Sequence, residues 1–152
     1  RLRASNGGQR WAAALAALPA HELLRAAGDP AGSRAVEALL DGEAASAAQK
    51  GATAASLAPK AGELAVSAAG SHVVERLMRW APDKSQVAAS LAARKEAIYA
   101  TRHGPHLLRA CDVQAYVRDP KGWAERRAAR SSAKASFEEI FGGGGGGGGR
   151  GA

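Results

Sequence analysis

Three polar residues, Ser71, His72 and Glu75, have the types and the spacing to contact a flat ligand that forms hydrogen bonds. A hydroxyl and a carboxylate accept hydrogen bonds, and an imidazole ring offers a flat face for stacking. At about 100° per residue on a helix, the three side chains are expected on one polar arc. The opposite arc is apolar and contains Val73, Val74 and Leu77. This pattern predicts a helix with one buried face and one exposed polar face.

The same pattern occurs on both sides of this run, each time beginning at a glycine. Gly32, Gly70 and Gly104 begin the three copies, at spacings of 70 − 32 = 38 and 104 − 70 = 34 residues. Periods in this range indicate a helical repeat array, in which stacked units share one core. The polar positions of the other two copies are Ser33, Arg34 and Glu37, and Pro105, His106 and Arg109.

The composition predicts closely packed helices, and together with the repeat period it predicts an all-α fold, an α-solenoid of three-helix repeats. Hydrophobic residues make up 46% of the chain but aromatic residues only 5%, and the abundant alanine favours closely packed helices. Asp29 and Pro30 are expected to cap and begin the first motif helix. We expect a lead-in helix or the end of a preceding repeat over 1–19, three repeats over 20–112 with motif helices near 30–41, 68–80 and 103–112, a cap with a basic helix over 113–141, and a flexible glycine-rich tail over 142–152.

Positive charge is concentrated in the second half of the chain. The formal net charge is +7, and residues 81–152 hold twelve Lys and Arg against seven Asp and Glu, compared with nine against seven in residues 1–80. Such an excess suits a polyanion such as nucleic acid, and it is equally compatible with a soluble surface. Candidates for sequence-independent phosphate contacts are Arg102, Arg109, Arg126, Arg127 and Arg130.

The run from Gly70 to Arg76 resembles the middle helix of Pumilio-type (PUF) repeats. That resemblance implies that each repeat takes one base of single-stranded RNA, and that Ser with Glu is associated with guanine. The third copy departs from the family pattern at Pro105 and Arg109, so we expect stacking by His106 and phosphate attraction there rather than base selection. The implied base-edge contacts are Ser33, Glu37, Ser71 and Glu75, and the implied stacking residues are Arg34, His72 and His106.

A closer resemblance covers about residues 22–127. The three glycine-initiated runs, followed by Val113-Gln114-Ala115-Tyr116 and Asp119-Pro120-Lys121-Gly122-Trp123, are similar to the C-terminal end of the nucleolar protein 9 family. This implies a curved α-solenoid in the nucleus and nucleolus that binds single-stranded or structured pre-ribosomal RNA. It also implies ribosome-assembly proteins as partners, and a role in pre-rRNA processing for the small subunit.

A different class of protein is built from the same kind of stacked helical units: a helical-repeat scaffold in an assembly particle that binds proteins and reads no bases. Such a scaffold would not require a stacking residue in the middle of each polar trio, as Arg34, His72 and His106 provide.

Catalysis, metal binding and a membrane span are not predicted. Ser71 and His72 are adjacent on a helix, so their side chains diverge by about 100° and do not form a nucleophile–base pair. Three histidines and the single cysteine, Cys111, lack the paired ligands of a zinc site. No run approaches the roughly 20 apolar residues of a transmembrane helix. We therefore expect a binding protein that is not an enzyme, with no cofactor and no small-molecule substrate.

Overall fold

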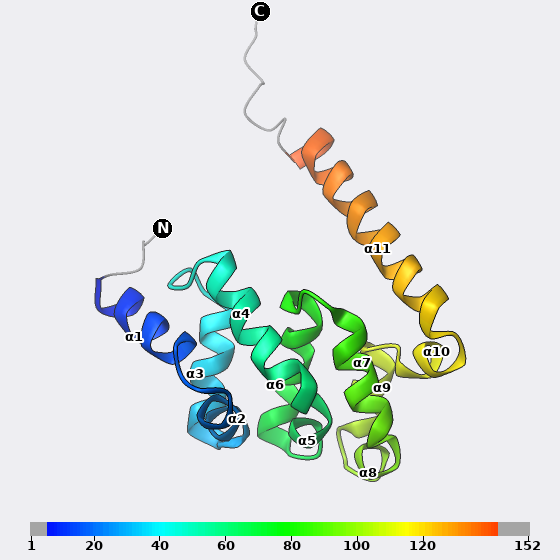
Figure 1. The fold of residues 1–152 in the computed structure, drawn as a ribbon, viewed down its shortest axis with the longest axis horizontal. Helices are drawn as coiled ribbons and strands as arrows, with labels where there is room; N and C mark the ends of the chain where they lie inside the picture. The colour runs from blue at the N-terminus through cyan, green and yellow to red at the C-terminus, as the bar shows by residue number, and fades with distance from the viewer. Residues whose placement is uncertain (1–5, 143–152) are drawn as a thin grey trace, which may run out of the picture.

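A computed structural model of the chain describes residues 6–142, and these residues form helices and contain no strand (Figure 1). The expectations for residues 1–5 and for the glycine-rich tail beyond Gly142 lie outside the described residues. The helices are α1 (Asn6–Ala16), α2 (Ala20–Gly28), α3 (Pro30–Asp41), α4 (Ala47–Leu57), α5 (Ala61–Ala65), α6 (Ala68–Trp80), α7 (Lys84–Ala93), α8 (Lys95–Tyr99), α9 (Gly104–Ala110), α10 (Val113–Arg118) and α11 (Pro120–Phe137), with a 3₁₀ turn at Ala58–Lys60 and a π-helical turn at Glu138–Gly142.

The first nine helices follow one another as three triplets, α1–α3, α4–α6 and α7–α9. The second helices, α2, α5 and α8, lie in a row along the lower edge of the view in Figure 1. The motif helices α3 and α6 pack against each other, and α6 packs against α9. The predicted all-α solenoid is therefore confirmed, and α1 takes the place in the first triplet that α4 and α7 take in the next two.

The repeated glycine is required by a close approach between the second and third helices of each triplet. A β-carbon on Gly70 would collide with the carbonyl oxygen of Leu64, six residues earlier in α5. The same collision recurs between Gly32 and Ala26 and between Gly104 and Ile98. The glycine therefore serves the packing of each triplet.

Side-chain caps begin the first two motif helices but not the third. As predicted, Asp29 caps α3, accepting hydrogen bonds from the backbone N–H groups of Ala31 and Gly32 at 3.0 and 2.8 Å. Ser67 caps α6 by accepting from the N–H of Gly70 at 2.9 Å. His103 precedes α9 without a capping bond.

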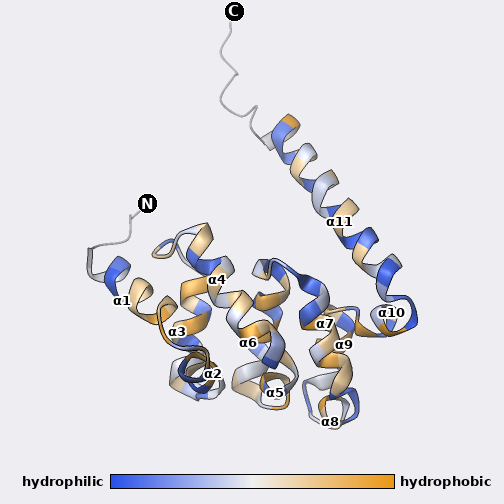
Figure 2. Ribbon diagram, viewed as in Figure 1, coloured by the Kyte–Doolittle hydropathy of each residue, from blue (hydrophilic) through white to orange (hydrophobic). Residues whose placement is uncertain are grey.

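The C-terminal helix α10 and the first turn of α11 cover one end of the stack, and the rest of α11 extends away from it. Trp123 at the start of α11 is 1% exposed, and its ring meets that of Tyr116 edge to face, with 5.3 Å between centroids. Beyond this anchor α11 projects away from the solenoid (Figure 1). Figure 2 shows apolar residues gathered in the triplets and mostly hydrophilic residues along α11. The core thus ends near Trp123, and the rest of α11 is largely exposed.

Candidate nucleic-acid interface

The exposed face of the motif helices carries the third and sixth positions of each copy, counted from its glycine. His72 is exposed on α6, and the side chain of Glu75 one turn later is 41% exposed. On α3 the matching side chains are Arg34, which is exposed, and Glu37, which is 23% exposed. His106 on α9 is 72% exposed. Residues able to stack and residues able to accept hydrogen bonds are therefore open to solvent on consecutive helices.

The two serines lie on the buried side of this face, so the expectation that Ser71 shares the exposed arc is wrong. Ser71 is 4% exposed, and its hydroxyl donates to the carbonyl oxygen of Ala68 at 2.8 Å. Ser33 is 3% exposed and donates to Pro30 at 3.1 Å. A helical serine often bonds to a carbonyl of the preceding turn in this way. The base-edge role of both serines stays a prediction, with their hydroxyls engaged by backbone in this structure.

Arg76 ties the first two motif helices together across their exposed face. Its guanidinium lies 3.4 Å from the carboxylate of Glu37 and donates to that of Asp41 at 2.8 Å. It also donates to the backbone carbonyl of His72 at 2.8 Å. The hydrogen bond to Asp41 is the main cause that raises the pKa of Arg76, with the charges of Glu37 and Glu75 adding to it. Arg76 therefore stays charged and fixes the orientation of Glu37.

A weaker contact joins the second and third motif helices. His106 lies 4.0 Å from the carboxylate of Glu75. The residue that corresponds to Arg76 in the third copy is Ala110, so no guanidinium bridges α6 and α9 at that level. A ring nitrogen of His103 lies 3.0 Å from the carbonyl oxygen of Ala65, and this contact links the second and third triplets.

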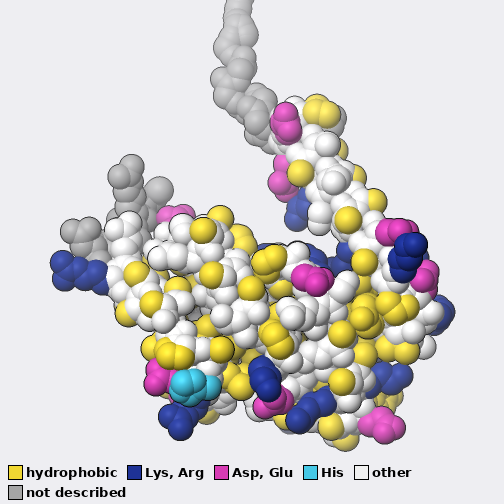
Figure 3. Space-filling view, in the orientation of Figure 1, with side chains coloured by type: hydrophobic (Ala, Val, Ile, Leu, Met, Phe, Trp, Pro, Cys, Tyr) yellow, Lys and Arg dark blue, Asp and Glu magenta, His cyan; other side chains and the backbone are white. Residues whose placement is uncertain are grey.

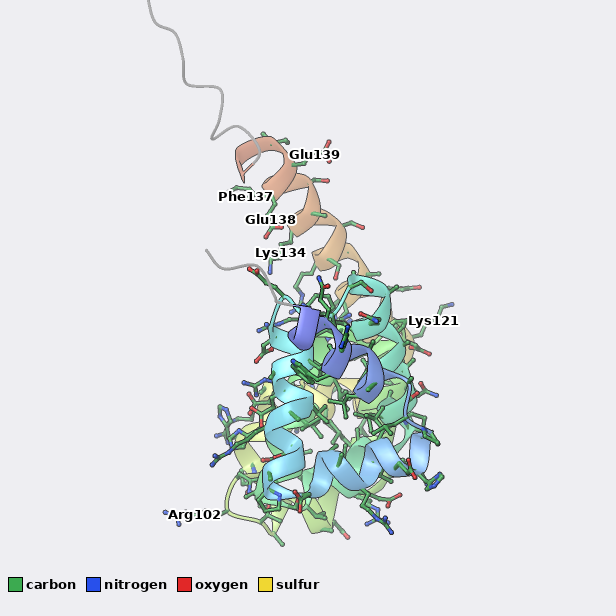
Figure 4. The ribbon with its side chains drawn as sticks, turned by 90° about the vertical axis from the view of Figure 1, so that its left-hand side faces the viewer. Arg102, Lys121, Lys134, Phe137, Glu138 and Glu139 are labelled. Carbon is green, nitrogen blue, oxygen red and sulfur yellow. The ribbon has the colours of Figure 1, made fainter. Side chains whose placement is uncertain are left out.

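The five arginines predicted to attract phosphate lie in different places. Arg126 faces Asp119 at 3.8 Å, and Arg102 projects from the turn before α9 (Figure 4). Arg109 lines a hollow of about 550 Å³ beside Tyr99. Arg127 and Arg130 share a second hollow, between the solenoid and α11.

Sequence reasoning missed three further cations of this region, Arg79, Lys84 and Lys134. Lys84 and Lys134 line the hollow with Arg127 and Arg130. Arg79 lines an adjoining hollow with Lys84, Arg127 and Lys134. For two of these cations, Arg79 and Lys134, the sequence spacing could have indicated the helix face on which they lie. Arg79 follows Glu75 by four residues, and Lys134 follows Arg130 by four, so each lies on the same helix face as its neighbour.

Outside this face, three features bear on other roles: the grouping of metal ligands, the single cysteine and the apolar character of the helices. Within residues 6–142, no three His, Cys, Asp or Glu side chains are grouped so that they could hold a metal ion. Cys111 is 1% exposed, and burial raises the pKa of its thiol to about 12. No helix in the described part of the chain has the length and apolar character to cross a membrane.

Comparison with known families matches residues 5–105 to the NOP9-like PUF repeat domain. The chain belongs to this family. Its fold is also that of solved PUF structures: those titled APUM23-GGAAUUGACGG and APUM23-GGAGUUGACGG each have a TM-score of 0.74 and 29% identity to this NOP9-like chain. The likeness covers 80% of this chain and 23% of each neighbour, so the NOP9-like chain spans about a quarter of their length. Among curated proteins, none matches the sequence.

Proposed function

We propose that this NOP9-like chain is an RNA-binding segment that contacts single-stranded regions of pre-ribosomal RNA. It acts without catalysis in small-subunit ribosome assembly and supports pre-rRNA processing in the nucleolus, beside ribosome-assembly proteins. Family membership supports the assembly role, and the RNA sequences in the titles of the APUM23 structures support an RNA partner.

One observation carries the proposal: Arg34, His72 and His106 are exposed at the same position of three motif helices that pack in sequence. Guanidinium and imidazole groups stack on bases, and stacking tolerates any base. Glu37 and Glu75 then add hydrogen-bond acceptors one turn further along α3 and α6. A carboxylate suits guanine, whose ring and exocyclic N–H groups donate, so base choice is assigned to these two residues.

Binding of labelled GGAAUUGACGG RNA, followed by fluorescence anisotropy, tests the proposal. The variant His72→Ala with Glu75→Ala removes one stacking group and one acceptor, and both side chains are exposed, so the fold is retained. A stacked base is worth roughly 1–3 kcal/mol, which predicts a loss of affinity between about fivefold and a hundredfold.

A matched control is available on α2, where His21 and Glu22 are both exposed on the second helix of a triplet. The variant His21→Ala with Glu22→Ala is expected to bind RNA like the unmodified chain. Equal affinity of the unmodified chain and the α6 variant would contradict base contact by α6. The protein-binding scaffold would then be the better account.

A further inference from the structure

A basic hollow of about 380 Å³ lies where α11 leaves the solenoid, next to the end of α6 and the start of α7. Two smaller hollows, of about 210 and 130 Å³, adjoin it and share Lys84, Arg127 and Ser131 with it. Figure 3 shows Lys and Arg side chains in this angle between the body and α11. The charged side chains lining the 380 and 130 Å³ hollows are Arg79, Lys84, Arg127, Arg130, Lys134 and Glu75.

Two of these cations have contacts that hold them in place, Lys84 with the end of α6 and Arg127 with Trp123 on its own helix. The ammonium group of Lys84 donates to the carbonyl oxygens of Arg79 and Ala81 at 3.3 and 3.2 Å. The guanidinium of Arg127 lies 4.8 Å from the ring centroid of Trp123, and its Nε is buried without a hydrogen-bond partner among the described residues. Both groups are therefore positioned before any ligand arrives.

The cations of the hollow are not neutralised by ion pairs, although the carboxylate of Glu75 lines it and lies 4.0 Å from His106. Among the described residues, none of the five cations forms an ion pair with a carboxylate. Asp83 lines the 210 Å³ hollow, and its carboxylate accepts from the backbone N–H of Ser85. Burial, and to a lesser degree the charge of Arg127, lowers the pKa of Lys84. An anion in the hollow would offset both effects.

Helix α11 supplies the outer wall as a row of cations. Arg127, Arg130 and Lys134 have the spacing i, i+3 and i+7, which places them on one face of a helix. In Figure 4, Lys134 projects on the same side of the molecule as Arg102, whereas Lys121 projects on the opposite side. Lys134 lines the hollow and Lys121 does not, so the face of α11 that bears Arg127, Arg130 and Lys134 is the one turned toward the hollow.

Glu75 connects the hollow to the exposed face of the motif helices. It lines the hollow and also lies one turn from His72 on α6. From this continuity we propose that the hollow binds a backbone phosphate of the RNA strand, next to the nucleotide that contacts α6. The inference rests on the proposed function. It assigns to α11 the role of holding the strand at the end of the repeat array.

The test is the salt dependence of binding to GGAAUUGACGG RNA, because each phosphate contact on a single strand contributes about 0.7 to the slope of log affinity against log salt. The variant Arg130→Gln with Lys134→Gln changes two exposed side chains that leave the core untouched. Arg127→Gln is measured separately, with a thermal melt to confirm folding. The charge-matched control is Arg118→Gln with Lys121→Gln, because both residues are exposed and neither lines the hollow.

We expect the Arg130 and Lys134 variant to bind RNA more weakly than the control, with a slope smaller by about 0.7 for each phosphate that the variant no longer binds. Its preference for guanine-containing RNA is expected to be unchanged. Equal slopes in this variant and in the control would overturn the phosphate site and leave the α6 contacts standing. Absence of RNA binding by the unmodified chain would overturn the proposed function together with the phosphate site.

Discussion

The second and third motif helices, α6 and α9, have the same packing but different exposed chemistry. Both have a glycine in the first turn that lies against a carbonyl oxygen six residues earlier, and both bury the apolar residues that follow. On the exposed face, α6 carries Glu75 and Arg76, whereas α9 carries Arg109 and Ala110 at the same positions. Packing and recognition therefore depend on separate residues of one helix, and one can change while the other is kept.

The largest effect is expected from the shared packing feature. Gly70→Ala places a methyl group against the backbone carbonyl of Leu64. Because the atoms approached belong to the backbone of a helix, they cannot move aside as the end of a flexible side chain could. Overpacking costs roughly 1–3 kcal/mol, and we expect the upper end here, seen as a lower denaturation midpoint in urea. The equivalent change Gly104→Ala is expected to cost a similar amount.

Gly51 provides the control for this prediction. It lies within α4, and a β-carbon there would meet nothing within 4 Å. Gly51→Ala is expected to raise the free energy of unfolding by up to about 1 kcal/mol, because alanine favours helix more than glycine. Comparable destabilisation at Gly51 and Gly70 would show that the close approach is not the reason for the repeated glycine.

The next effect separates the two interfaces between motif helices. Arg76 bridges α3 and α6, and nothing equivalent bridges α6 and α9 among the described residues. Because Arg76 is partly exposed, we expect Arg76→Ala to lower the free energy of unfolding by about 1 kcal/mol or less. A double-mutant cycle with Asp41→Asn should give a measurable coupling energy that shrinks as salt is added. A coupling energy near zero would contradict the bridge.

The last effect appears only in alkaline solution and concerns Cys111, which takes the place of Leu77 in the third copy. Its thiol ionises near its ordinary pKa of 9.0 in the unfolded chain, but burial raises the pKa to about 12 in the folded protein. Above pH 9 the unfolded chain therefore loses this proton first, and stability falls as the pH rises toward 12. Between about pH 8 and 10.5, the unmodified chain should lose more stability than Cys111→Ala. Equal losses would contradict a buried, protonated thiol.

The sequence predicted the fold better than the exposed face. The glycine periodicity and the apolar arc opposite His72 were sufficient for the α-solenoid, because helical packing imposes both on every triplet. The predicted polar arc was wrong at Ser71. This residue lies at the edge of the arc beside the apolar residues, and its hydroxyl donates to a backbone carbonyl instead. The hollow could not be predicted because it depends on the direction in which α11 leaves Trp123, which no local pattern encodes.

The measurement that tests the account most directly is the guanine preference of two variants, one on α6 and one on α9. The preference is the ratio of affinities for GGAAUUGACGG and for the same RNA with adenine in place of guanine. Glu75→Gln replaces a carboxylate acceptor by an amide of the same shape, and losing a hydrogen bond to a charged group costs about 1.5–3 kcal/mol. We predict that this ratio falls roughly tenfold or more in Glu75→Gln, whereas Arg109→Gln weakens both RNAs equally. An unchanged ratio in Glu75→Gln, or an equal fall in both variants, would contradict base reading by α6.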